Sequence, residues 1–301
     1  MIGPELEAPR PPGGPGFAEA VTFAFGDPRT GLHGSARLGV TAGEAPAATV
    51  LALLFAGGEP VAAAAQGGLP VPSGWSWDRL EAGGLRTRTL SPLASWRVAF
   101  AGQDGGGFDL AFDAISPPFG DPDGSGPVAA AGGLAGYAQL CRVTGAVTAA
   151  GETREIACLG QRGHEWGVAG WDRVTAARSV SAWLGDRHAV VFSSVRPAGA
   201  AGHDAEAAAA WIVDAAGDGE PAGRRVEDPR LSTAVDADGR PLRAGFELWE
   251  SGDAEVPRRS SGQAAAVATL HLGELRLDAA VFGWRMEGRE GVGRYDLLRR
   301  A

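Results

Sequence analysis

The sequence of 301 residues lacks lysine and asparagine, so arginine alone carries its positive charge. Without lysine there is no Schiff base, no phosphate-loop lysine and no Ser–Lys catalytic pair. The formal net charge is -9, and the longest basic runs are pairs such as Arg258-Arg259. A polyanion binds tightly only to a basic surface, so we expect no nucleic-acid partner.

Long hydrophobic runs are also missing. The longest apolar run, around Val50, is far shorter than the ~20 residues that a membrane-spanning helix needs. The N-terminus shows no basic start followed by an apolar stretch, which disfavours a signal peptide, and its prolines and glycines indicate a flexible arm over residues 1–16. We therefore expect a soluble, cytoplasmic protein with no transmembrane segment.

The chain has only two cysteines, Cys141 and Cys158, on neighbouring predicted strands. Neither belongs to a C-x-x-C pair, so the sequence gives no support for a zinc or redox centre. In a reducing cytoplasm two buried thiols are the default, and whether the two cysteines pair stays open.

Patterns for metal, serine or dinucleotide chemistry are incomplete. The stretch HEWGV begins like a zinc-protease helix, but Val168 stands where the second histidine belongs. A nucleophile elbow would need serine at Glu165, and the glycine-rich GREGVGRY lacks a strand–turn–helix setting. The remaining histidines are isolated, at His33, His188, His203 and His271. We expect neither a metal nor a cofactor.

Short strands dominate the pattern. Residues 96–100 and 108–115 flank three glycines as hairpin arms, and Phe108, Leu110 and Phe112 alternate with polar or small residues. Residues 138–160 and 179–195 repeat this arrangement. About sixteen to twenty strands would overfill one small barrel, so we predict an all-β fold of two antiparallel barrel or sandwich domains.

Three segments do not fit a simple strand pattern. Residues 116–136 and 196–206 are rich in proline or glycine, and the longer of them is predicted to be an irregular loop that forms a lid or binding edge. Residues 203–213 start with a helix-capping pattern and end in strand formers, so they fit either a helix or a strand.

The stretch LGQRGHEWGVAGW, residues 159–171, concentrates polar and aromatic side chains. A histidine between an indole and a carboxylate is a setting that tunes a proton donor or base, and aromatic faces can stabilise positive charge on carbon. Arg162, His164 and Glu165 can equally form a buried polar network that pins strands together, and spacing alone favours that structural interpretation. The nine tryptophans likewise fit either core packing or the wall of an apolar cavity.

Four segments, residues 22–40, 115–119, 137–147 and 159–171, resemble a bacterial family with a lipocalin-like double domain. The resemblance runs from Phe17 to beyond Trp211. The signature of that family reads roughly Y-E-Q … V-x-G … G-x-G-x-R-D-H-S-W-G-x-R-x-W. The family is distantly similar to the carotenoid 1,2-hydratases (hydroxyneurosporene synthases), tocopherol cyclase and the fungal lipocalin-like Diels–Alderases.

The resemblance implies two calycin-type β-domains, residues 17–170 and 171–301, with a β-barrel cavity for a lipophilic ligand such as an isoprenoid or polyketide. It also implies cofactor-free, proton-driven hydration, isomerisation or cyclisation, as in a lyase or isomerase. On this basis we expect His164 to handle the proton, with Glu165 or Arg162 setting its charge. The expected ligand-binding residues are Trp166, Trp171, Tyr137, Gln139, Trp183 and Trp96.

The sequence departs from the family signature at three positions. Gly163 replaces an aspartate that resembles the acid of the hydratases, Glu165 replaces a serine, and Ala138 replaces a glutamate. Because neighbouring residues on a strand point to opposite faces, Glu165 reaches the side of His164 only if the backbone bends there.

Two other functions stay open beside the enzyme. The protein would be a non-catalytic carrier if the same cavity held a ligand without an acid. It would be a degenerate family member if the motif served folding alone. The sequence leaves the substrate, the pathway and the oligomeric state undetermined.

Overall fold

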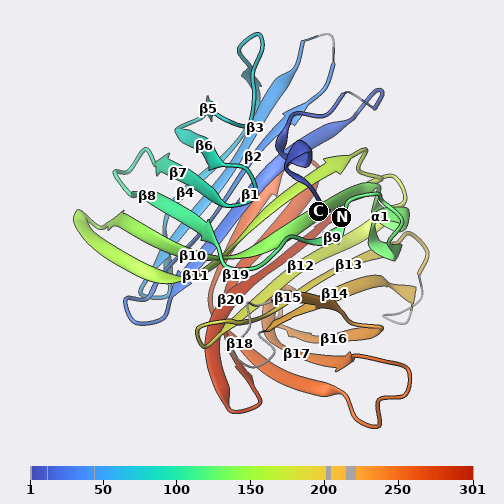
Figure 1. Cartoon of the computed structure of the whole chain (residues 1–301). Coiled ribbons are helices and arrows are strands. Elements are labelled where there is room, and N and C mark those ends of the chain that lie inside the picture. The colour runs from blue at the N-terminus through green and yellow to red at the C-terminus, as the bar shows by residue number, and fades with distance from the viewer. Residues whose placement is uncertain (1, 12, 44, 201–204, 215–221, 301) are drawn as a thin grey trace. The chain divides into compact units, whose positions relative to one another are not determined.

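The computed structural model describes residues 2–11, 13–43, 45–200, 205–214 and 222–300, and β-strands dominate it (Figure 1). The chain forms two compact units: unit 1 is Met1–Asp123 with Leu134–Ala169, and unit 2 is Gly124–Gly133 with Gly170–Ala301. Each unit contains one curled antiparallel sheet. The predicted all-β fold with two antiparallel barrel-like domains is confirmed.

Unit 1 is built on an 11-stranded sheet in the order β4-β3-β2-β1-β11-β10-β8-β7-β6-β5, with β9 paired to β10. Its strands are β1 (Ala18–Asp27), β2 (Leu32–Thr41), β3 (Ala47–Ala56), β4 (Glu59–Pro70), β5 (Leu80–Ala82), β6 (Leu85–Ser91), β7 (Ser95–Ala101), β8 (Gly107–Ala114), β9 (Phe119–Asp121), β10 (Leu134–Ala149) and β11 (Glu152–Gly167). A 3₁₀ helix, Pro4–Glu7, precedes the sheet.

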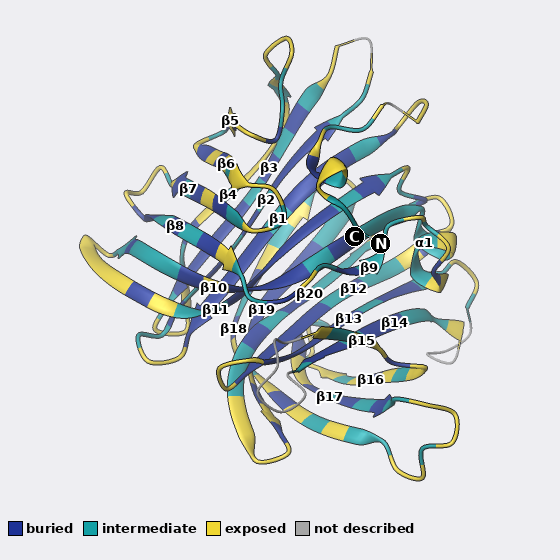
Figure 2. Cartoon of the chain, viewed as in Figure 1, coloured by how far each residue is buried: buried dark blue, intermediate teal, exposed yellow. Residues whose placement is uncertain are grey.

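Alternating side chains form the core of unit 1. Along β1, Val21, Phe23 and Phe25 face one interior cluster, and along β8 Phe108 and Phe112 face the same cluster. The Phe23 and Phe112 rings meet edge to face, with centroids 5.1 Å apart. Figure 2 shows the resulting alternation of buried and more exposed positions along the strands. Burial of these rings stabilises the curled sheet.

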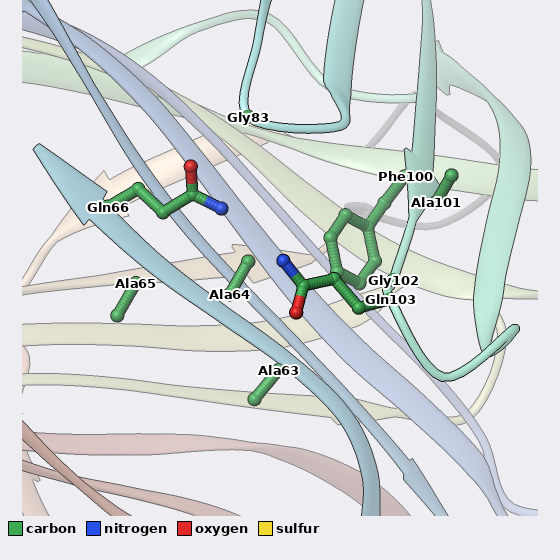
Figure 3. Close-up of a pocket in the computed structure, with 9 residues that line it drawn as sticks. All are labelled: Ala63, Ala64, Ala65, Gln66, Gly83, Phe100, Ala101, Gly102 and Gln103. Carbon is green, nitrogen blue, oxygen red and sulfur yellow. The ribbon is translucent and has the colours of Figure 1, made fainter. Parts of the chain in front are cut away.

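The two edges of the sheet in unit 1 approach each other. A Cβ atom placed on Gly83, in the turn after edge strand β5, would lie 3.1 Å from Cδ1 of Leu69 on the other edge strand, β4. A pocket of about 210 Å³ lies along this seam, as Figure 3 shows. Gln66 of β4 and Gln103 after β7 face one another across it, beside the ring of Phe100.

Unit 2 has a 9-stranded sheet in the order β15-β14-β13-β12-β20-β19-β18-β17-β16. Its elements are α1 (Pro127–Gly132), β12 (Val174–Leu184), β13 (His188–Pro197), β14 (Ala207–Asp214), β15 (Ala222–Arg225), β16 (Asp228–Val235), β17 (Pro241–Trp249), β18 (Arg258–Leu272), β19 (Leu275–Met286) and β20 (Arg289–Arg300). In both units the first strand pairs with the last, and the remaining strands extend outward on either side.

The predicted hairpins are confirmed. Strand β7 pairs with β8, β10 with β11, and β12 with β13, each antiparallel and across the predicted turn. The irregular loop predicted at residues 116–136 is partly wrong, because β9, α1 and the start of β10 lie within it. Small residues and Pro127 at the first turn allow the short helix, which ends at Gly132 and is capped by Gly133 with a left-handed φ of 83°.

The ambiguous segment at residues 203–213 resolves as a strand in its described part, Ala207–Asp214. His203 lies outside the described residues. In the described part of the chain, no helix has both the length and the apolar character required to cross a bilayer.

Candidate functional site

Strand pairing assembles the predicted motif in the interior of unit 1. His164 of β11 stands opposite Val21 of β1 and Tyr137 of β10. Arg162, two residues earlier, stands opposite Gln139 of β10. Because β11 is regular here, Arg162, His164 and Trp166 share one face. Arg162 and His164 are each 1% exposed, so this face is inward.

A buried carboxylate contacts the imidazole of His164. Nε2 of His164 lies 2.7 Å from Oε1 of Glu19, which comes from β1. The indole of Trp77 donates to the same oxygen at 3.0 Å, and the backbone N–H of Arg10 donates to the other oxygen at 2.9 Å. Glu19 is thus supplied with donors from three separate segments, as a buried carboxylate requires.

A second buried carboxylate, that of Glu7, neutralises Arg162. Nη1 of Arg162 lies 2.8 Å from Oε1 of Glu7, and Nη2 donates to Oε2 at 3.1 Å. The indole of Trp96 donates to Oε2 at 3.1 Å, and the guanidinium lies 4.8 Å from the centroid of that ring. The ion pair is therefore both hydrogen-bonded and stacked.

Tyr137 connects the two carboxylate clusters. Its hydroxyl donates to Oε1 of Glu7 at 2.5 Å and lies 3.4 Å from Nδ1 of His164. Burial raises the pKa of Tyr137, so the phenol stays protonated at neutral pH and can donate its one hydrogen. We call Glu7, Glu19, Tyr137, Arg162 and His164 the interior network.

The protonation state of His164 follows from these contacts. Burial lowers the pKa of His164, although Glu19 opposes that effect, so the imidazole is neutral at pH 7. A neutral imidazole carries its hydrogen on Nε2, where Glu19 accepts it. Nδ1 then holds a lone pair toward Tyr137, whose hydrogen goes to Glu7. The 3.4 Å separation of Nδ1 and the hydroxyl fits this arrangement.

Aromatic rings surround the imidazole. The centroids of Trp77 and Trp166 lie 5.7 and 5.3 Å from that of His164, both edge to face. The guanidinium of Arg10 lies 3.5 Å from the centroid of the Trp166 ring. Water reaches none of the His164 side chain, whose exposed fraction is 0%.

Glu165 does not join the network. It points to the opposite face of β11 and pairs with Arg37 of β2, with Oε1 at 3.0 Å from Nε. The backbone runs straight through residues 162–166 in register with β1 and β10, so the bend that would bring Glu165 to His164 is not present. Gly163 lies on this same outer face, where a Cβ atom would meet Oγ1 of Thr22 at 2.5 Å.

Gln139 is buried but serves the backbone. Its amide donates to the carbonyl oxygens of Leu93 and Ser116, at 2.9 and 3.2 Å. These bonds tie β10 to the segments before β7 and β9. Of the other expected ligand-binding residues in unit 1, Tyr137 belongs to the interior network, and Trp96 and Trp166 lie beside it.

Trp171 and Trp183 belong to unit 2. The backbone oxygen of Trp171 accepts hydrogen bonds from Arg300. Trp183 is 3% exposed and alternates with Ala182 and Leu184, which face the apolar core of that unit. Trp183 therefore lies on the other face of its sheet.

Sequence reasoning missed both carboxylates of the network and Trp77. Glu19 carried a usable signal, because it is the one charged residue in the apolar run 17–25 and has the same parity as Val21 and Phe23. Glu7 carried none, since it lies in the segment predicted to be a flexible arm. Its burial, at 6% exposed, depends on partners more than 80 residues away.

The cysteines are both free thiols. Cys141 is buried and Cys158 half-buried, and they are not opposite one another, since Cys158 faces Val143 across the β10–β11 pair. Burial raises the pKa of each thiol to about 12. Thiols held protonated in this way are poor nucleophiles at neutral pH.

Comparisons with known proteins give a family and a fold. A family model described as "Domain of unknown function (DUF7064)" matches residues 3–301. A comparison with curated protein sequences gives no match.

Solved structures share the fold at low sequence identity. One is a Nitrosomonas europaea protein provisionally named AttH, with a TM-score of 0.65, 14% identity and coverage of 95% of this chain and 92% of that one. Another is CghA with Sch210972, with a TM-score of 0.63, 13% identity and coverage of 95% and 89%. A further structure of CghA gives a TM-score of 0.64 at 12% identity, with the same coverage. At such identities the likeness concerns the fold.

Proposed function

We propose a function on the premise that this chain belongs to the family Domain of unknown function (DUF7064): it binds a lipophilic small molecule in unit 1 and moves a proton on it through His164. The reaction is a hydration, isomerisation or cyclisation that needs no cofactor. Reactions of these kinds belong to the carotenoid hydratases, tocopherol cyclase and the lipocalin-like Diels–Alderases, which the sequence resembles distantly.

The observation that carries the proposal is the buried pair of His164 and Glu19, 2.7 Å apart. A neutral imidazole whose Nε2–H is fixed by a carboxylate presents a basic Nδ1, and the carboxylate stabilises the imidazolium that forms when Nδ1 takes a proton. The imidazolium can then return that proton to another carbon or oxygen of the same molecule. One group therefore serves as base and acid, as an isomerisation or cyclisation requires.

The surroundings of His164 support an apolar substrate. The indoles of Trp77 and Trp166 flank the imidazole, and Phe17 packs against Trp166 and Tyr137. Such walls exclude water and can stabilise cationic carbon. The solved structure of CghA contains the small molecule Sch210972, and that protein shares this fold.

Glu165 leaves the proposed mechanism, because its partner is Arg37 on the outer face of the sheet. Glu19 takes the role expected of Glu165, that of the carboxylate beside the imidazole. Arg162 remains as the charge that anchors the second carboxylate, Glu7.

A carrier without catalysis is the second candidate. The observation that favours it is the full burial of the His164 side chain, with a carboxylate partner already in place. A network of that kind also fixes the strands of a binding scaffold.

Turnover after substitution of His164 separates the two candidates. The purified protein is incubated with a total bacterial lipid extract, bound compounds are detected by native mass spectrometry, and products are followed by chromatography with mass detection. His164→Gln keeps a side-chain N–H for Glu19 but has no titratable nitrogen. We expect it to bind the same compound as the wild type without converting it. His271→Gln, at an exposed position in unit 2, is the matched control.

A carrier returns the compound unchanged from wild type and variant alike. Conversion by the His164→Gln variant at the wild-type rate would remove His164 from the reaction.

A further inference from the structure

Glu7 reaches the interior network from outside the sheet. It ends the 3₁₀ helix Pro4–Glu7, whose backbone bonds, from Leu6 N–H to Gly3 and from Ala8 N–H to Glu5, remain within the segment. Its three partners, Trp96, Tyr137 and Arg162, lie on β7, β10 and β11, and they are 89, 130 and 155 residues away in the chain. The partners are therefore fixed by the sheet, and the carboxylate is supplied by a separate short segment.

The sheet holds a complete set of donors for one carboxylate. Arg162 offers two guanidinium nitrogens, Tyr137 its hydroxyl and Trp96 its indole N–H, and all converge on the two oxygens of Glu7. The three donor residues are at most 4% exposed. A buried guanidinium without an anion is strongly unfavourable, so this part of the sheet requires an anionic occupant.

The residues around Glu7 in the N-terminal segment place aliphatic side chains where the apolar part of a ligand would lie. Ile2 and Leu6 pack against a cluster formed by Phe17, Tyr137 and Trp166. Leu6 is the direct neighbour of Glu7. The segment thus places a carboxylate on the guanidinium and aliphatic carbon on the aromatic cluster next to it.

We propose that Arg162, Tyr137 and Trp96 form the carboxylate subsite of the ligand-binding site, that Glu7 occupies it as a built-in substitute, and that the ligand is a lipophilic carboxylic acid. This inference rests on the proposed function, since it assumes that a ligand enters unit 1. The planar pair of nitrogens on Arg162 matches a carboxylate. Tyr137 spans the subsite and His164, so a carboxylate bound there brings the carbon body beside the imidazole.

The tether sets a condition on the ligand. A carboxylate attached to the chain competes at an effective concentration on the order of millimolar, so a free carboxylate without an apolar body displaces it poorly. Burial of the apolar body supplies the additional affinity. In the wild-type protein the affinity therefore rises with the length of the apolar chain.

The test begins with Glu7→Ala, which empties the subsite. Thermal unfolding is followed with acetate, hexanoate and decanoate, against chloride, sulfate and decanol as controls. We expect a carboxylate at ten times its dissociation constant to raise the melting temperature of the variant by roughly 3–5 °C, with no shift from acetate in the wild type. Glu5→Ala, an exposed position on the same 3₁₀ turn, should behave like the wild type.

A second measurement uses the unaltered protein, in case Glu7→Ala does not fold. A glutamate-specific protease cleaves after Glu7 only when that side chain leaves the network. Decanoate should accelerate this cleavage several-fold and decanol should not. The inference is overturned if folded Glu7→Ala shows no response specific to carboxylates, or, where that variant is unfolded, if decanoate leaves the cleavage rate unchanged.

The two proposals fail separately. Carboxylate binding to Glu7→Ala with no conversion of any compound by the wild type would retain the subsite and reject the catalytic function. Conversion of a neutral compound that depends on His164, with no response of Glu7→Ala to carboxylates, would do the reverse.

Discussion

The two units share a strand order but differ in the chemistry of their interiors. In unit 1 the first and last strands pair so that Val21 faces His164, and in unit 2 they pair so that Val180 faces Tyr295. Two residues before the valine stands Glu19 in unit 1 and Arg178 in unit 2. Each sheet therefore carries a charged side chain at the same place on its first strand.

The partners of those charges differ. In unit 2, Arg178 pairs with Glu206 and donates to Thr233, whose hydroxyl lies 2.6 Å from that of Tyr295. At the position that Tyr295 takes in unit 2, unit 1 has His164, whose imidazole is hydrogen-bonded to the carboxylate of Glu19. An imidazole changes charge near neutral pH, whereas a tyrosine does not. The same strand arrangement thus places a tyrosine in an arginine–glutamate cluster in one unit and a histidine beside a glutamate in the other.

Breaking the buried ion pair of unit 1 should give the largest effect. Arg162→Leu leaves Glu7 without its cation and should lower the free energy of unfolding by about 3–5 kcal/mol. Arg178→Leu in unit 2 should have a smaller effect, because Arg196 still pairs with Glu206. Urea unfolding, with hydrogen exchange to assign the loss to a unit, measures both. Equal losses of unfolding free energy in Arg162→Leu and Arg178→Leu would contradict the expected difference between the units.

The next largest effect is expected from changing the ring that stands opposite the valine of the first strand. This ring is His164 in unit 1 and Tyr295 in unit 2. His164→Ala removes one hydrogen-bond donor from Glu19 and leaves a cavity, so it should lower the free energy of unfolding by roughly 2–3 kcal/mol. Tyr295→Phe removes only a hydroxyl, at about 0.5–1.5 kcal/mol. Thermal unfolding of the two variants in parallel checks the order. A Tyr295→Phe protein less stable than His164→Ala would mean that the cluster of unit 2 matters more for stability.

The pH dependence of stability should be steeper in unit 1. Burial lowers the pKa of His164 below its usual value of 6.5 and that of His33 to about 4. The unfolded chain therefore takes up protons at these sites first. Above pH 6.5 these histidines do not reduce the free energy of unfolding. Below pH 6.5 each of them lowers it by up to ~1.4 kcal/mol per pH unit.

His188, whose pKa burial also lowers, is the matched site in unit 2. Unfolding between pH 7 and 5 should become less pH-dependent in His164→Gln, His33→Gln and His188→Gln. An unchanged profile in His164→Gln would show that the imidazole titrates alike in the folded and unfolded chains.

The smallest effect is expected at Glu165, the direct neighbour of His164 in the chain. Glu165 and Arg37 are 37% and 34% exposed, so Glu165→Gln should change the free energy of unfolding by no more than ~0.5 kcal/mol. The contrast with His164 tests the assignment of the two residues to opposite faces of β11. A loss of turnover in Glu165→Gln with stability unchanged would return Glu165 to the mechanism.

Local pattern predicted the strands well, because it depends on alternation within a few residues. The alternation of Phe108, Leu110 and Phe112 predicted β8, and the turn at Gly185 predicted the β12–β13 pair. The segment at 116–136 was harder, since a one-turn helix and a three-residue strand have too few residues for a period. Its structure depends on pairing between Phe119 and Ala138.

The motif itself was half predictable. Arg162, His164 and Trp166 were predicted because polar and aromatic residues concentrate at 159–171 and match the family signature, and the structure places all three on one face of β11. The role of Glu165 was misplaced since its spacing could not show that β11 stays straight. Glu7 and Glu19 were missed because the contacts of Glu7 join residues 89 to 155 positions apart and the contact of Glu19 with His164 joins residues 145 positions apart.

The sequence alone determined the class of fold, the positions of most strands and the face of β11 on which its polar residues meet, because each of these follows from alternation along a short stretch of chain. Only the tertiary structure decided which carboxylates neutralise Arg162 and accept from His164. That choice depends on how the sheet of unit 1 curls and on where the short N-terminal segment packs against it. Both are long-range features of the fold, and they are favoured because a buried charge needs a partner of opposite charge.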